Sequence, residues 1–169
     1  MSYKNFKKAM ELAKTLPGYK IHDCCSDKAM DELESYLGFK LSKQHYEFLR
    51  QGALEVQACI FCANFKDSHY SSMDVIANSE LNKKYNLKVD DKCVPVLKED
   101  EWINYLNYNK LTKDGEPTVV YAWPAPDAFI IYKQTELDLG DFLLELFKEV
   151  KENFCLLYTS DAADELDGV

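Results

Sequence analysis

The sequence lacks most of the motifs that identify an enzyme. Its six glycines are scattered, so no glycine-rich loop is available to hold a phosphate, and it has neither a nucleophile-elbow serine nor a His-Glu-x-x-His pair. No run approaches the ~20 apolar residues that a membrane span requires, and the start of the chain is interrupted by Lys and Glu too often for a signal-peptide core. These absences do not exclude an enzyme, but they favour a cytoplasmic binding module.

Positive charge is also scarce. The chain has 20 Lys and Arg against 29 Asp and Glu, a formal charge of −9. This balance, without an obvious basic stripe, argues against nucleic-acid binding. An acidic surface suits a basic protein partner and equally well suits simple solubility. A chain of 169 residues with 47% hydrophobic content is large enough and apolar enough for one globular domain.

The cysteines make no complete site. Without a secretory signal we expect the six to be reduced and mostly buried. Cys59 and Cys62 have the spacing of half a zinc site, but only Cys93 and the adjacent pair 24–25 could complete it. In an extended strand, residues three apart point to opposite faces. His22 precedes the 24–25 pair, yet no third group is marked to orient it as a base. We therefore expect no catalytic residue, metal or cofactor, and we expect His45, in a helix, to be exposed.

The periodicity of the apolar residues predicts an α+β fold. Helices are predicted over residues 3–16, 26–38, 42–52, 74–85 and 139–154, with Ser26 and Ser42 as N-caps and Gly38 at a left-handed C-cap. Strands are predicted over 53–65 and 92–97, and as a hairpin of 117–123 and 128–133 around "PAPD". Residues 66–73 are predicted to be a loop, and helix is favoured for 99–111. We expect a single domain, a mostly antiparallel sheet flanked by N-terminal helices and a closing C-terminal helix.

Aromatic residues beside acids form the remaining constellation. They occur in "EDEWINYLNY" and "YAWPAPD". At interfaces a ring supplies contact area and a neighbouring charge supplies register. The predicted partner-binding residues are Glu99, Asp100, Glu101, Trp102, Tyr105, Tyr108, Trp123 and Asp127. The alternative that Trp102 and Trp123 are core residues stays open.

The stretch "MDELESYLGFKLSKQHYEFLRQG" (30–52) carries a family resemblance. It has a helix ending in Glu-x-x-Leu-Gly, a second helix start, an aromatic, and Phe-Leu before a glycine. The matching residues are Glu34, Leu37, Gly38, Leu41, Tyr46, Phe48, Leu49 and Gly52. This order resembles the opening of the SUKH superfamily, which includes the Smi-one/Knr-four regulators, although Ser42 stands where that family usually has Pro. "DLGDFLLELF" is similar to the family's final helix, so the resemblance covers about residues 27–152. We predict a helical extension over 1–25 and a SUKH-like domain over 26–154.

The resemblance implies an α+β domain without known catalytic residues. Many bacterial members look like cytoplasmic immunity proteins that block a cognate toxin by binding it. The leading hypothesis is therefore an immunity protein that neutralises a toxin domain, with neither a nucleic-acid nor a membrane partner. The alternatives are a regulatory scaffold of Smi-one/Knr-four type and, with less support, a thiol-dependent or zinc enzyme that uses Cys59 and Cys62.

The end of the chain lacks the apolar periodicity of the segment before it. "CLLYTSDAADE" (155–165) is what one reading frame of a transposase-type sequencing adapter encodes. We predict that residues 155–169 are a non-native tail, disordered or weakly packed. The tail holds four acidic residues and no Lys or Arg, so without it the formal charge of −9 becomes −5.

Overall fold

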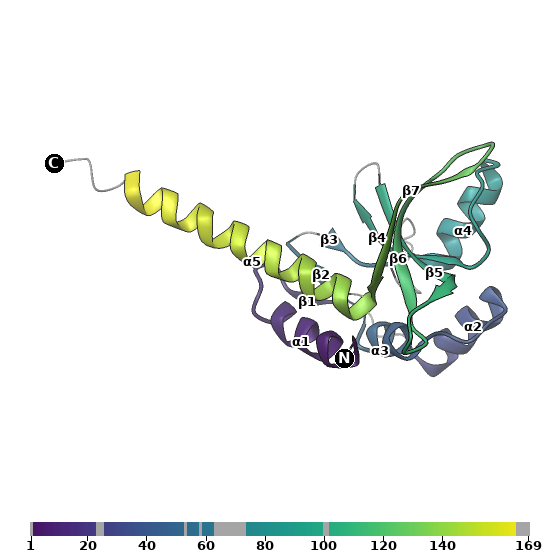
Figure 1. Ribbon diagram of the computed structural model, residues 1–169, viewed down its shortest axis with the longest axis horizontal. Coiled ribbons are helices and arrows are strands. Elements are labelled where there is room, and N and C mark those ends of the chain that lie inside the picture. The colour runs from purple at the N-terminus through teal and green to yellow at the C-terminus, as the bar shows by residue number, and fades with distance from the viewer. Residues whose placement is uncertain are drawn as a thin grey trace.

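A computed structural model of the chain describes the backbone of residues 2–22, 26–52, 54–57, 59–62, 74–99 and 102–164, and side chains within these ranges except at 2, 59, 99, 102 and 154–164. Within these ranges the fold is α+β, as predicted, with helices on both sides of an antiparallel sheet (Figure 1). The helices are α1 (Ser2–Ala13), α2 (Asp27–Leu37), α3 (Lys43–Arg50), α4 (Val75–Lys84) and α5 (Leu139–Asp164).

The strands form two antiparallel sheets. A small sheet has the order β1 (Lys20–Ile21), β2 (Leu54–Val56) and β3 (Cys59–Ile60). The main sheet has the order β4 (Cys93–Glu99), β5 (Trp102–Leu111), β6 (Pro117–Pro124) and β7 (Phe129–Asp138). Each strand of the main sheet pairs with its neighbour in the sequence, so β7 is an edge strand.

Local signals place the helix ends. The hydroxyl of Ser26 accepts a hydrogen bond from the Ala29 N–H at 3.2 Å, and that of Ser42 accepts one from the His45 N–H at 3.4 Å. Gly38 ends α2 with φ +77°, a left-handed conformation that glycine adopts without steric cost. Each cap satisfies a backbone group that the helix itself leaves unpaired, which is why these boundaries are readable from the sequence.

The helix favoured for residues 99–111 is wrong. Residues 102–111 form β5, a central strand of the main sheet. Ile103 and Tyr105 face one side of the sheet, while Leu106 and Tyr108 face the other. Because a central strand is covered on both faces, its apolar residues do not alternate with polar ones, and the pattern can be mistaken for helical spacing.

The strand predicted over residues 53–65 is two strands. β2 and β3 pair antiparallel, with Val56 opposite Cys59. The chain reverses at Gln57, whose φ of +49° lies in the left-handed region. Gln is not a usual turn residue, so the sequence carries no signal for this reversal. Residues 53, 58 and 63–65, and the loop predicted over 66–73, lie outside the described part of the chain.

Two apolar clusters pack on opposite faces of the main sheet. The larger cluster joins α1, α3 and α5 through rings such as Phe6, Phe48 and Phe147. α1 therefore belongs to the main core, although the sequence analysis treats residues 1–25 as an extension. The smaller cluster holds Tyr105 and Val120 on the other face.

α5 continues past the predicted end at residue 154 and runs to Asp164. Its second half projects away from the body of the protein (Figure 1). The side chains from 154 onward are outside the description, so the weak packing and the origin of residues 155–169 stay predictions.

Candidate protein-binding surface

The structure does not bring the predicted partner-binding residues together. Tyr105 is buried in the smaller cluster, where its ring packs edge-on against Phe129 with centroids 5.2 Å apart. Tyr108 lies on the opposite face of β5 and is only partly exposed. The two rings lie on opposite faces of β5, so they do not share one contact face, and a contact role for either stays a prediction.

Tyr108 has a structural role instead. Its hydroxyl accepts a hydrogen bond from the Ser42 N–H at 3.1 Å and lies 2.9 Å from His45 Nδ1. These contacts attach β5 to the first turn of α3. Burial raises the pKa of Tyr108 to about 12 and lowers the pKa of His45 to about 3, so both side chains are neutral at pH 7. The expected exposure of His45 is wrong, because α3 packs this residue against the sheet.

The acidic group of the prediction lies at the β4–β5 connection. The backbone of Glu99 pairs with that of Trp102. Their side chains, and the whole of Asp100 and Glu101, lie outside the described part of the chain. A contact role for these four residues stays a prediction.

Trp123 and Asp127 lie at the β6–β7 hairpin. Asp127 is exposed in the connection between the two strands. The Trp123 side chain is 38% exposed, so it is not a core residue. Of the predicted residues with described side chains, these two share one exposed region.

Three large neighbours extend the apolar surface at Trp123. Ile130, Ile131 and Tyr132 are 51%, 43% and 46% exposed. We call Trp123, Ile130, Ile131 and Tyr132 the hairpin patch. The sequence analysis missed the last three, although four apolar residues in a row, "FIIY", do not fit the alternation of a strand with one solvated face.

The hairpin patch exposes both faces of the sheet edge. Ile130 pairs with Trp123, whereas Ile131 pairs with the buried Ala122 on the other face. Successive residues of a strand point to opposite faces, so apolar side chains flank the open edge on each side. Natural edge strands are usually protected by charges, Pro or a covering segment. Large exposed apolar patches are common where a protein binds another protein.

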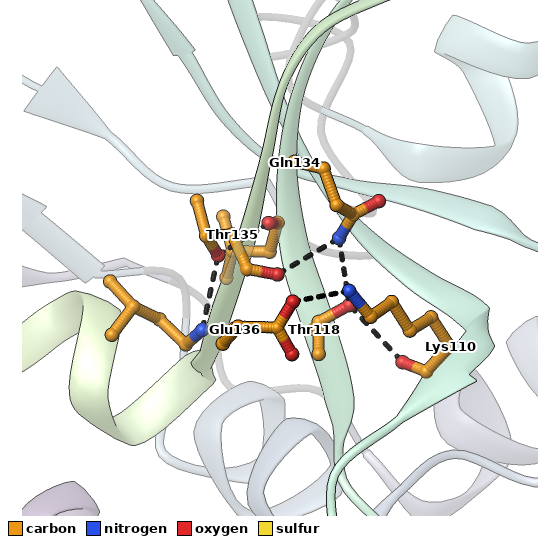
Figure 2. A network of polar contacts seen from close by, with 7 residues as sticks. Lys110, Thr118, Gln134, Thr135 and Glu136 are labelled. Atoms are coloured by element: carbon orange, nitrogen blue, oxygen red, sulfur yellow. Dashed lines mark hydrogen bonds and ion pairs between the residues drawn. The ribbon is translucent and has the colours of Figure 1, made fainter.

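The other half of β7 is polar and internally bonded (Figure 2). Lys110 Nζ pairs with Glu136 Oε1 at 2.5 Å. The Gln134 side-chain amide donates to Thr118 Oγ1 at 3.1 Å, and the Thr135 hydroxyl donates to the Val119 carbonyl at 2.6 Å. These bonds join β5, β6 and β7, so the half of β7 next to the hairpin patch is held in place.

A buried polar network anchors the end of β7. The Gln44 side-chain amide donates to Asp138 Oδ2 at 3.2 Å, and its oxygen accepts the Gly140 N–H at 2.6 Å. The Gln44 N–H donates to both carboxylate oxygens of Glu116, with N···O distances of 3.3 Å. The Glu116 carboxylate thus lies at the N-terminus of α3, where the helix dipole favours negative charge. Burial raises the pKa of Glu116.

The residues that carry the family resemblance also have structural roles. The Glu34 carboxylate accepts the Leu41 N–H at 3.0 Å and forms an ion pair with Lys40, which fixes the connection between α2 and α3. Burial alone would raise the pKa of Glu34, but Lys40 and the Leu41 N–H lower it below its ordinary value. These contacts give the Glu-x-x-Leu-Gly pattern a structural role in the α2–α3 connection.

The described thiols have the properties of core residues. Cys62 and Cys93 are free and buried, and burial raises the pKa of each to about 12. The thiolate is the reactive form, so neither is an activated nucleophile at neutral pH. The side chain of Cys59 is outside the description, and His22 Nε2 lies 2.6 Å from Glu55 Oε2. Within the described residues, no three His, Cys, Asp or Glu side chains are grouped to hold a metal ion.

Comparison of the chain with models of protein families and with curated proteins gave no match. None of the helices in the described ranges has the length and apolar character to cross a membrane.

Proposed function

We propose that this protein binds a partner protein through the hairpin patch, and that it is an immunity protein of SUKH type that neutralises a cognate toxin. The observation that carries the binding role is the exposure of large apolar side chains on both faces of the β7 edge. The immunity role rests on the resemblance of residues 30–52.

The occupant that fits the patch is an extended segment of the toxin. A partner that lay flat on one face of the sheet would cover Ile130 or Ile131 but leave the other in water. A strand added beside β7 covers both faces at once and pairs with the open backbone of the edge. The proposed partner segment therefore adds a fifth strand to the main sheet and carries apolar side chains on both of its faces.

Charge favours a basic toxin. The chain has a formal charge of −9, and −5 without residues 155–169. Opposite net charges raise the rate at which two proteins meet and orient them before contact. The bonded half of β7 supports the same role, since a rigid strand loses little conformational freedom on binding.

Coexpression with a toxin encoded beside this gene tests the proposal. Ile131→Lys places a charge in the patch, and we expect it to weaken toxin binding at least tenfold, the loss of about 1.4 kcal/mol or more that a central interface residue contributes. Ile21→Lys on β1 is the matched control, because Ile21 is 44% exposed and belongs to the small sheet, not to the main sheet that carries the hairpin. It is expected to bind like the parent protein.

Two results would contradict the proposal. If no toxin encoded nearby is bound or neutralised, the immunity role is wrong, and broad co-purification of other proteins would then favour the scaffold alternative. If a toxin is bound equally by the parent protein, Ile131→Lys and Ile21→Lys, the hairpin patch is not the contact surface. Circular dichroism of each variant separates loss of binding from loss of fold.

A further inference from the structure

A pocket of about 300 Å³ lies between α5, the main sheet and the turn at Gln57. Its lining includes Gln57, Asn104, Tyr121, Phe142, Glu149 and Asn153. The volume is at the lower end of the ~300–1,000 Å³ typical of ligand sites. It therefore suits one side chain or a small fragment better than a cofactor.

The pocket holds polar groups that no described residue satisfies. Asn104 is 1% exposed, and neither its Nδ2 nor its Oδ1 has a hydrogen-bond partner within the described chain. Buried amides are almost always paired, so this one requires an explanation. Asn104 is more buried than the other polar lining residues.

The backbone at the rim is strained. Gln57 has φ +49°, and its N–H donates to the Pro17 carbonyl at 3.0 Å, which holds it in that conformation. A non-glycine residue in the left-handed region costs free energy, and such residues concentrate at functional sites.

The charge and rings of the lining select a cation. Glu149 is the one charged side chain among the described lining residues, and it forms no ion pair with the described part of the chain. The Tyr121 ring already attracts a cation, because Lys133 Nζ lies 4.9 Å from its centroid. Lys133 has no carboxylate partner among the described residues, so it can leave the ring when another cation arrives.

We propose that this pocket receives an arginine side chain of the protein partner. A guanidinium has five donors in one plane, pairs with a carboxylate and amide oxygens, and stacks on aromatic rings. Glu149 supplies the carboxylate, Gln57 and Asn153 supply exposed amide oxygens, and Tyr121 supplies the ring. The unpaired Asn104 amide lies buried against the same pocket. The inference rests on the proposed function, since the pocket joins the hairpin patch where the Tyr121 and Tyr132 rings pack with centroids 5.8 Å apart.

The test uses the full chain and a small probe in place of the partner. N-acetyl-arginine methylamide is titrated while amide resonances are followed by NMR, beside the citrulline analogue, which has the same shape without the charge. We expect saturable shifts at the pocket residues and binding of the citrulline probe at least tenfold weaker, because a hydrogen bond between charged groups contributes more than a neutral one.

Variants on α5 and β7 provide the controls. Glu149→Gln is expected to weaken binding of the arginine probe about tenfold. Glu145→Gln, one turn earlier on the same helix, removes the same charge outside the lining and is expected to bind as the parent does. Lys133→Gln removes the resident cation and is expected to bind the probe as tightly or more tightly.

Equal binding of the two probes, or of the Glu149→Gln and Glu145→Gln proteins, would overturn the inference. So would weaker binding by Lys133→Gln. The probe experiment needs no partner, so it separates the two proposals. Ile131→Lys should leave probe binding intact, and a hairpin patch that fails to bind a toxin would not remove an arginine pocket that the titration finds.

Discussion

Gly140→Ala tests the contact between α1 and α5. A methyl group at residue 140 would lie 2.7 Å from the Phe6 backbone N and 2.8 Å from Phe6 Cα, distances that real Cβ atoms do not show. No rotamer change relieves a clash with backbone, so the two helices must move apart. The new methyl would also lie 2.7 Å from Gln44 Oε1, the atom that accepts the Gly140 N–H.

The expected cost follows from these contacts. Overpacking a core costs about 1–3 kcal/mol, and losing the Gln44 hydrogen bond adds about 1 kcal/mol. Alanine is a better helix former than glycine, which returns up to about 1 kcal/mol. We expect a net loss of about 2 kcal/mol, and a melting temperature lower by about 4–8 °C for a chain of this size.

Thermal unfolding followed by circular dichroism measures the loss, and Gly115→Ala is the control. Gly115 has φ +80° and nothing within 4 Å of an added Cβ, so its substitution carries backbone strain without a clash. Asn tolerates that conformation, so Gly115→Asn should recover stability, whereas Gly140→Asn should be worse than Gly140→Ala. A Gly140→Ala protein that melts at or above the parent temperature would refute the close approach of the helices.

Two further predictions follow from burial. The pKa of His45 is about 3 in the folded protein against 6.5 for the free side chain. Between pH 3 and pH 6.5, therefore, the unfolded state binds a proton that the folded state does not bind. Lowering the pH from 6.5 to 5 should therefore reduce the free energy of unfolding, measured by urea titration, by about 2 kcal/mol. The His45→Gln protein should not show this reduction. Equal pH dependence of stability in the two proteins would contradict the burial of a neutral His45. At pH 8 a thiol reagent should leave Cys62 and Cys93 unlabelled until the protein is unfolded, and mass spectrometry that finds native Cys62 labelled at the rate of a free thiol would contradict its burial.

Sequence reasoning succeeded where the information is local. The N-caps Ser26 and Ser42 and the left-handed Gly38 act within one helical turn, and the structure confirms all three. The hairpin around "PAPD" is confirmed for the same reason, since its turn residues and flanking strands are contiguous.

Sequence reasoning failed where the apolar residues of one segment fit both the spacing of a helix and the spacing of a strand. The stretch around Tyr105 and Tyr108 has apolar residues at spacings that fit a helix and a doubly buried strand equally well. Only pairing with β4 and β6 decides for the strand, and those partners are set by the fold as a whole. The same pairing turns Tyr105 and Tyr108 to opposite faces of the main sheet.

The sequence by itself determined the α+β class, the caps of α2 and α3, and the lack of a recognisable catalytic motif. The caps are local because each depends on neighbours within a few residues. The tertiary structure alone decided which aromatic residues reach the surface and which polar groups meet in a pocket. Trp123 and Ile130 become one patch through strand register. Asn104 and Glu149, 45 positions apart in the chain, line one pocket because α5 packs beside the main sheet. Contacts over such distances depend on how whole elements pack, and composition and periodicity do not encode that arrangement.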